Sequence, residues 1–286
     1  MSDPSGGPFP VVADPVLAAG LADVAVAVAE EAAALVRQAR RGHVEVAASK
    51  TSEVDVVTET DRASEQLVRA RLAVLRPDDA VLGEEGDDVA GTTGVRWVVD
   101  PVDGTVNFLY DLPQYAVSVA AEVDGETVAG VVVDVAAGTS YVARVADDGS
   151  GRVVALRDGV PLRVRPGVPL GQRLVGTGFS YDAAVREQQA RSLVHLLPRV
   201  RDVRRMGACA LDLCHVAGGS LDGYVEEGTH LWDHAAGALL VRAAGGRVLR
   251  GPGASGRDLL LAGPDDGFDD LERLTRDAGY WAATDH

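Results

Sequence analysis

"WVVDPVDGTVNF", residues 97–108, joins an apolar segment to two aspartates that stand three positions apart. The run "VRWVVD" at 95–100 is almost continuously apolar, which is typical of a strand buried on both faces. Loops at strand ends are where functional sites are usually built. The stretch therefore predicts a buried strand that ends in an acidic site, with Pro101 stiffening a turn directly after it.

Two further acidic clusters are expected to meet this one. Glu84 follows the short apolar strand "AVLG" at 80–83, and Asp233 opens a helix about 130 residues later. Mg²⁺ prefers oxygen ligands, and two such ions close together need a carboxylate that bridges them. Asp100 is placed to bridge, and the carbonyl of Val102 and the carboxylate of Asp103 can face the same space.

A hydroxyl and backbone amides complete the candidate site. Gly104 and Thr105 offer N–H groups to an anion, and the Thr105 hydroxyl held by Asp61 is a plausible relay for a water proton. Each piece taken alone has a simpler interpretation: "DPxDG" as a capped turn, Asp61 and Asp233 as helix N-caps, and Glu84 as a surface acid. Their joint occurrence favours a site.

Composition limits the function. The 286 residues carry 27 Lys+Arg against 43 Asp+Glu, a formal net charge of −16, which argues against direct nucleic-acid binding. The start "MSDPSGGPFP" is polar and is not expected to act as a signal peptide, and no apolar run reaches the length of a membrane span. Cys209 and Cys214 are expected to be buried thiols rather than a disulfide. These features predict a cytoplasmic protein without nucleic-acid or membrane partners.

The pattern of elements predicts an α+β fold with layers of helix and sheet in two halves. Residues 1–13 are expected to be a disordered tail, 14–150 an N-terminal α+β sub-domain, and 151–286 a C-terminal α/β sub-domain, with a turn-rich stretch at 146–172. Asp14 and Pro15 read as the start of the first helix. The expected helices span about 14–41, 62–75, 183–197, 208–217, 233–244 and 268–279. The segments at 115–123, 127–135 and 139–145 are expected to form an antiparallel meander.

Five ordered motifs resemble the inositol monophosphatase family. "WVVDPVDGTVNF" (97–108) is similar to its first signature and "WDHAAGALLVRAAGG" (232–246) to its second, with "DVVTETD" (55–61), "LGEEG" (82–86) and "GACALDLCHVAGGSLDGYVE" (207–226) around them. The resemblance covers roughly residues 14–280. It implies a layered αβαβα sandwich of the inositol monophosphatase and fructose-1,6-bisphosphatase type, with the site between two sub-domains.

The resemblance also implies roles for the matching residues. It implies two to three Mg²⁺ ions, of which one is held by Glu84, Asp100 and the Val102 carbonyl and one by Asp100, Asp103 and Asp233. Asp61 and Thr105 would orient and deprotonate the attacking water, with Glu84 assisting through a weaker third ion. The phosphate and substrate contacts would come from Gly104, Thr105, Glu226, Cys209 and Lys50.

The implied activity is direct in-line hydrolysis of inositol monophosphate or a similar sugar phosphate, with lithium inhibition and a homodimer as family traits. Two changes bear on the substrate: Ala208 stands where many relatives have Ser or Thr, and Cys209 replaces a common Ala. Histidinol phosphate and fructose 1,6-bisphosphate are the alternative substrates. An alternative of another class is a non-catalytic binding factor in a bacterial transcription complex, and a structural metal-binding protein is a third.

Overall fold

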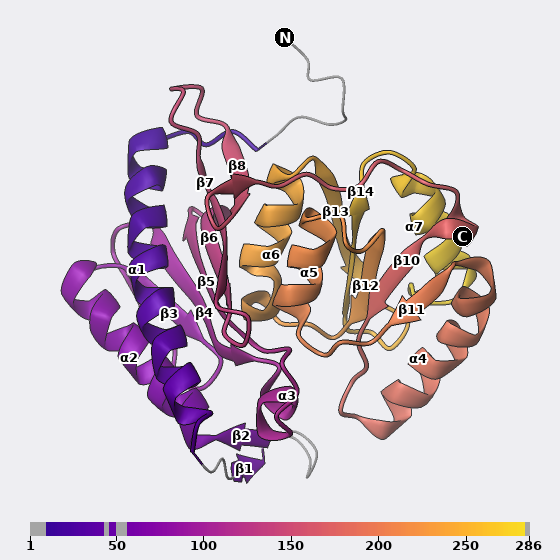
Figure 1. Ribbon diagram of the computed structural model, residues 1–286, viewed down its shortest axis with the longest axis horizontal. Coiled ribbons are helices and arrows are strands. Elements are labelled where there is room, and N and C mark those ends of the chain that lie inside the picture. Colours follow the sequence, from indigo (N-terminus) through magenta and orange to yellow (C-terminus); the bar gives the residue numbers. More distant parts are fainter. Residues whose placement is uncertain (1–9, 43–45, 50–55, 284–286) are drawn as a thin grey trace.

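The computed structural model describes residues 10–42, 46–49 and 56–283, and its elements stack in five layers (Figure 1). Two helices cover one face of a seven-stranded sheet, two lie between this sheet and a five-stranded sheet, and two cover the outer face of the second sheet. In that order the pairs are α1 (Pro15–Ala39) and α2 (Glu59–Leu75), α5 (Cys209–Ala217) and α6 (Leu231–Ala243), and α4 (Ala183–Leu196) and α7 (Phe268–Asp277). The αβαβα sandwich expected from the sequence is confirmed.

The seven-stranded sheet has the simple order β3-β4-β5-β6-β7-β8-β9. Only β3 and β4 run parallel, and every later neighbour is antiparallel, so the expected meander is present. The strands are β3 (Ala80–Gly83), β4 (Val95–Asp103), β5 (Ala116–Val123), β6 (Glu126–Asp134), β7 (Thr139–Val145), β8 (Val153–Arg157) and β9 (Val160–Pro161). The last two strands lie in the stretch that the sequence suggested was turn-rich, and the chain leaves this sheet only after Pro161.

The five-stranded sheet has the order β11-β10-β12-β14-β13, with β10 parallel to both of its neighbours and β14 antiparallel to both of its own. Its strands are β10 (Leu174–Thr177), β11 (Asp202–Arg204), β12 (Gly223–Glu227), β13 (Gly246–Pro252) and β14 (Asp258–Pro264). Shorter elements are β1 (Val46–Ser49), β2 (Val56–Thr58), α3 (Thr105–Leu109), η1 (Leu170–Gln172) and η2 (Leu197–Arg199). None of the helices in the described ranges combines the length and apolar character that a membrane-spanning helix requires.

Successive side chains of the buried strands point to opposite faces of the sheet, which explains why helices pack on both faces. Trp97 and Val99 of β4 pack in the core with α1 and α2, whereas Val98 packs in the core with α5 and α6. Helix α6 reaches the sheet closely because a β-carbon on Gly130 of β6 would come within 2.9 Å of the α-carbon of Ala236. This contact fixes the helix that carries Asp233 against the strands next to β4.

Three local expectations need correction. The strand β4 does not end at Asp100 but continues through Pro101 to Asp103, with an irregular register. The N-cap of α2 is Thr58 rather than Asp61, and the N-cap of α6 is His230 rather than Asp233. Each acid instead occupies the third helical position and accepts a hydrogen bond from the backbone N–H of its cap residue, which is the acidic half of a capping box. Asp14 caps α1 as expected.

Candidate active site

Segments far apart in the sequence meet at one pocket of about 1040 Å³ between the two sheets. On one side are the ends of β3 and β4 with α3, and on the other are the loops after β10 and β11, the end of β12 and the start of α6 (Figure 1). The expected site residues that line it are Glu84, Asp100, Val102, Asp103, Gly104, Thr105, Cys209, Glu226 and Asp233. Lys50, and residues 1–9 of the expected tail, lie outside the described residues.

The irregular end of β4 turns two aspartates into the same pocket. Asp100 pairs with Ser118 of β5 and Asp103 pairs with Ala116. The chain therefore advances three residues on β4 while it advances two on β5. In a regular strand, residues three apart point to opposite faces, and one extra residue reverses that alternation. The bulge therefore brings the side chains of Asp100 and Asp103 to one side, and both are buried.

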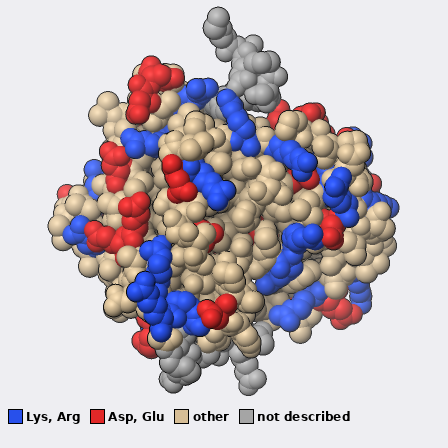
Figure 2. All heavy atoms as spheres, in the orientation of Figure 1, with Lys and Arg blue, Asp and Glu red and all other residues tan. Residues whose placement is uncertain are grey.

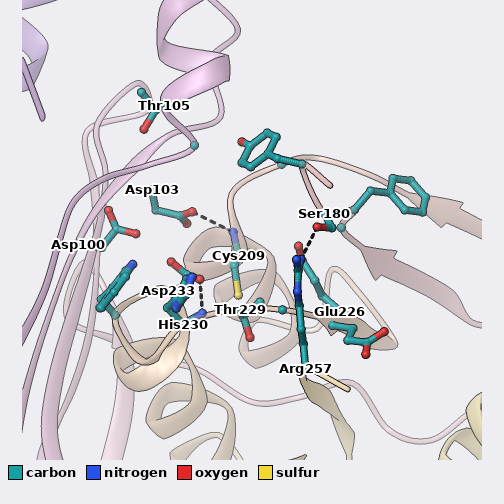
Figure 3. A pocket seen from close by; sticks show the side chains of 18 of the residues that line it. Asp100, Asp103, Thr105, Ser180, Cys209, Glu226, Thr229, His230, Asp233 and Arg257 are labelled. Carbon is teal, nitrogen blue, oxygen red and sulfur yellow. Dashed lines mark hydrogen bonds between the residues drawn. The ribbon is translucent and has the colours of Figure 1, made fainter. Parts of the chain in front are cut away.

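Asp103 is held from across the pocket by the first turn of α5. Its carboxylate accepts a hydrogen bond from the backbone N–H of Cys209 at 3.2 Å (Figure 3) and another from that of Ala210 at 2.7 Å. Burial raises its pKa to about 7, and the nearby carboxylates Glu226 and Glu84 add to the rise, while the amide of Ala210 opposes it. This carboxylate thus ties the first sheet to the central helices and still faces the pocket.

Asp61 and Thr105 form a hydrogen-bonded pair next to the end of β4. The Thr105 hydroxyl lies 2.9 Å from Asp61 Oδ1 and 3.0 Å from the Val102 carbonyl oxygen. Asp61 is fully buried, and its other oxygen accepts from the N–H and hydroxyl groups of Thr58. Burial raises the pKa of Asp61, which these hydrogen bonds partly offset. A buried carboxyl that holds one hydroxyl at the pocket wall is a suitable proton relay.

The loop that carries Glu84 depends on a residue that the sequence did not identify. Glu65 of α2 accepts hydrogen bonds from the N–H groups of Glu85 at 2.7 Å and Gly86 at 2.8 Å, and it pairs with Arg69 at 2.7 Å. A β-carbon on Gly83 would lie 2.4 Å from the Glu65 carboxylate, so the loop can approach only as glycine. Along the helix, Glu65 and Arg69 read as an ordinary i,i+4 ion pair, and only the fold shows the loop above them.

Carboxylates dominate the electrostatics of this side of the pocket. Burial is the largest cause of the raised pKa values of Asp100 and Asp233, and the charges of Glu84 and Asp103 raise both values further. No arginine or lysine of the described residues is among the leading influences on Asp100, Asp103 or Asp233. Like charges buried together favour protons or a bound cation.

The donor set fits a hard divalent cation. Asp103 accepts hydrogen bonds from α5 at both of its oxygens. Asp100 and Asp233 each use only one oxygen on a fixed partner, the N–H of Val102 at 3.1 Å and that of His230 at 2.6 Å. The remaining oxygens face a common pocket, where oxygen ligands suit Mg²⁺ together with water and phosphate. Within residues 10–42, 46–49 and 56–283, however, no three Asp, Glu, His or Cys side chains converge on one point closely enough to enclose an ion by themselves.

Gly104 and Cys209 also line the pocket. Gly104 has φ of 89°, and a β-carbon there would lie 2.8 Å from the Gln114 carbonyl oxygen, so both its backbone conformation and the space require glycine. The Cys209 side chain points toward the pocket between the carboxylates and Glu226 (Figure 3). Burial raises the pKa of the Cys209 thiol, so the thiol lines the pocket as a neutral group.

The opposite wall carries Glu226 at the end of β12. Burial raises the pKa of Glu226, and a hydrogen bond from the Tyr224 hydroxyl and the charge of Arg205 lower it in part. A β-carbon on Gly178 would lie about 2.0 Å from the Glu226 carboxylate, so the loop after β10 packs directly on this acid. Figure 3 shows Glu226, Ser180 and Arg257 on the far side of Cys209 from the aspartates. The sequence singled out Glu226 but neither arginine.

Comparison with known proteins gives a consistent result. The model of a family described as the inositol monophosphatase family matches residues 18–267. An inositol-1-monophosphatase SuhB of Mycobacterium tuberculosis is 46% identical over 273 residues, which cover 88% of this chain and 91% of that protein. A Nus factor SuhB of Pasteurella multocida is 39% identical over 196 residues, which cover 68% of this chain and 71% of that protein.

Solved structures agree in fold. A structure of Mycobacterium tuberculosis SuhB has a TM-score of 0.77 and 44% identity and covers 92% of this chain and 98% of its own. An inositol monophosphatase from Anabaena has a TM-score of 0.77 and 28% identity and covers 90% of this chain and 96% of its own.

Proposed function

The chain belongs to the inositol monophosphatase family, a family of phosphatases, and on that basis we propose that it is a Mg²⁺-dependent phosphomonoesterase of inositol monophosphate or a similar sugar phosphate. The observation that carries the proposal is the bulge of β4. It places Asp100 and Asp103 in one pocket with Glu84 and Asp233, next to the hydrogen-bonded pair of Asp61 and Thr105.

The proposed magnesium ions would be held by carboxylates and one carbonyl. Two to three ions would use the oxygens of Glu84, Asp100, Val102, Asp103 and Asp233. When bound, magnesium would neutralise the charge of the phosphate and activate a water molecule. The remaining steps depend on how the chain's own residues place the reactants.

The hydrolysis is proposed to be direct and in line. Thr105 would orient the attacking water and pass its proton to Asp61, because the two side chains are already hydrogen-bonded and Asp61 is shielded from solvent. The backbone N–H groups of Gly104 and Thr105 would bind the phosphate oxygens. Positioning and electrostatic stabilisation supply most of the rate in such reactions.

The substrate's alcohol would lie against the opposite wall. Glu226 would accept a hydrogen bond from a substrate hydroxyl, Cys209 would contact the ring, and Lys50 would approach from its loop. Inositol monophosphate is the first candidate, because the residues around Glu226 resemble inositol-type members of the family. Histidinol phosphate and fructose 1,6-bisphosphate remain the alternatives, since Ala208 and Cys209 shape this part of the pocket.

A second candidate function comes from the relatives named Nus factor. A protein used only as a binding factor in a transcription complex does not need a proton relay. The intact pair of Asp61 and Thr105 therefore favours the enzyme. Homodimeric assembly, lithium inhibition and a cytoplasmic location stay predictions.

The test is phosphate release from inositol 1-phosphate, fructose 1,6-bisphosphate, histidinol phosphate and adenosine 3′,5′-bisphosphate, each with Mg²⁺ and with EDTA. We expect inositol 1-phosphate to be hydrolysed fastest and EDTA to stop the reaction. If another ester leads by tenfold or more, the phosphatase chemistry holds and the substrate assignment is wrong. If no ester is hydrolysed with Mg²⁺ present, the binding-factor function replaces the enzyme.

A further inference from the structure

We propose that Gln189 of α4 positions Glu226, and that this buried glutamine thereby sets how tightly the alcohol portion of the substrate is bound. The inference rests on the proposed function, in which Glu226 accepts a hydrogen bond from a substrate hydroxyl. Glu226 lines the pocket, whereas Gln189 does not. Gln189 therefore acts on the pocket wall from behind, as a positioning residue.

Gln189 lies on the inner side of a helix whose outer face is charged. Acidic and basic side chains are interspersed over α4 (Figure 2), and Glu187 and Arg191 of this helix pair with each other. The Gln189 side chain is only 3% exposed. A buried primary amide is costly unless its oxygen and its nitrogen both find partners. The two partners of Gln189 therefore show which parts of the fold depend on it.

The two ends of the Gln189 amide bind the two segments that enclose Glu226. Its Oε1 accepts a hydrogen bond from the backbone N–H of Ser180, in the loop after β10, at 2.8 Å. Its Nε2 donates to the backbone carbonyl of Glu227, the residue directly after Glu226 in β12, at 3.2 Å. One side chain of α4 thus ties the loop to the end of the strand.

This tie lies just beyond the point where the two strands stop pairing. The last pair in the parallel register of β10 and β12 joins Thr177 to Val225. Gly178 and Glu226 are the next residues on the two chains, so the sheet ladder ends directly before Glu226. The amide of Gln189 bridges the two chains past that point.

The loop that Gln189 holds packs on the Glu226 carboxylate itself. A β-carbon on Gly178 would lie 2.0 Å from Glu226 Oε1, so the bare backbone of the loop covers this acid. The Tyr224 hydroxyl donates to the other oxygen, Oε2. If the loop moved away, the carboxylate would gain conformational freedom that substrate binding would have to remove. A firmly held loop therefore favours tight binding.

The other bonds of the loop at Ser180 are more open to water. Its carbonyl accepts from Arg186 at 2.9 Å and its hydroxyl from Arg257 at 2.5 Å, and both bonds are exposed. The bond from Gln189 to Glu227 is buried, and the bond from Ser180 to Gln189 is partly buried. Water competes less for buried hydrogen bonds, so Gln189 contributes more to holding the loop than the two arginines do.

The test is a double-mutant cycle of Gln189→Met and Glu226→Gln with inositol 1-phosphate and saturating Mg²⁺. Methionine keeps the length and the helix propensity of glutamine and removes both hydrogen bonds. Glu226→Gln should raise KM by about tenfold or more, because a bond to a charged acceptor is lost. Gln189→Met should raise KM about fivefold and leave kcat within about twofold. In the Glu226→Gln background, Gln189→Met should raise KM by less than about 1.5-fold, since the residue that it positions is already changed.

The neighbouring glutamine is the matched control. Gln188 does not line the pocket and forms no hydrogen bond within the part of the chain that the structure describes. Gln188→Met should therefore change neither KM nor kcat by more than about 1.5-fold. If Gln189→Met does not fold, Gln189→Glu takes its place in the cycle. It keeps the acceptor for Ser180 and loses the donor to Glu227, and it should raise KM by about twofold or more.

Three outcomes would overturn the inference: an unchanged KM in the Gln189 variant, a fall in kcat as large as the rise in KM, or the same rise in KM in the Glu226→Gln background. The last outcome would give Gln189 a structural role only. Failure of the proposed function is seen separately, as no turnover of inositol 1-phosphate by the wild-type protein. Calorimetric titration of the same variants with inositol 1-phosphate and Mg²⁺ then decides the inference. The same pattern in Kd supports it, and equal Kd values or no binding to the wild-type protein contradict it.

Discussion

The molecule buries two kinds of acid, and they differ in their partners. Glu65, Asp79 and Glu122 are each buried beside an arginine at 2.6–2.7 Å. Asp100 and Asp103 are equally buried, yet other carboxylates surround them.

The pKa values follow this difference. Burial alone would raise the pKa of Asp79, but hydrogen bonds from Arg76, Thr93 and Trp97 outweigh it and hold the pKa below its usual value. For Asp100 burial and its neighbours act in the same direction, and the pKa lies well above its usual value. An acid neutralised by its own protein supports the fold, whereas clustered acids without such a partner are suited to a cation from outside.

The largest effect on activity is expected at one of the two pocket acids that have no arginine beside them. Asp103→Asn should lower kcat by about 1000-fold or more, because a preorganised charge aimed at the reacting group contributes on this scale. The amide oxygen can still accept one of the two hydrogen bonds from α5, so the far-UV circular dichroism and the melting temperature should be retained. Phosphate release under saturating Mg²⁺ measures the effect. Activity above one tenth of the wild-type value would contradict the two-metal assignment.

The same change at a buried acid that pairs with an arginine should lower stability instead of activity. Asp79→Asn leaves Arg76 without its charge partner and weakens the bond from the Trp97 indole, which lies at 3.0 Å. Breaking a buried pair on one side typically destabilises a protein by about 3 kcal/mol. Urea unfolding should show this loss, while kcat per folded molecule stays within about twofold. A large fall in kcat at unchanged stability would show that the two sets are not distinct.

Magnesium should stabilise the protein more at high pH than at low pH. The folded-state pKa of Asp103 is raised to about 7, so its contribution to stability is fully present below its unfolded value near 4 and is lost as pH rises through 7. Metal binds the deprotonated carboxylates and restores about 2 kcal/mol, or a shift of roughly 5 °C, mainly above pH 7. Thermal unfolding at pH 5.5 and pH 8, with and without Mg²⁺, tests this. An equal or larger shift at pH 5.5 would refute it, and Asp103→Asn should reduce the difference between the two pH values.

Local patterns predicted most of this arrangement. The layers, the meander and the start of α1 at Asp14 follow from periodicity and capping, which act within a few residues. Asp61 and Asp233 were expected to begin helices. They in fact occupy the third position of two capping boxes, a small shift that turns each carboxylate back toward the cap residue.

The remaining features depend on tertiary contacts. The bulge of β4 is defined by its register against β5, and strand β8 by its pairing with β7, so neither can be read from its own residues. Glu65 and Arg205 look like ordinary surface charges along the sequence. A loop with two glycines packs on Glu65, and Arg205 lines the pocket, and neither position can be read from the sequence alone.

The smallest effect is expected where both charges are exposed. Glu187 and Arg191 of α4 approach to 2.6 Å, but their side chains are 68% and 76% exposed. Water screens such a pair, and ordering two long side chains opposes its formation, so Glu187→Gln should change the free energy of unfolding by no more than about 0.5 kcal/mol. Urea unfolding of this variant and of Asp79→Asn compares a solvent-exposed acid–arginine pair with a pair whose acid is buried. Similar losses of unfolding free energy in the two variants would contradict the comparison. Burial would then not explain why some acid–arginine pairs stabilise this fold and others do not.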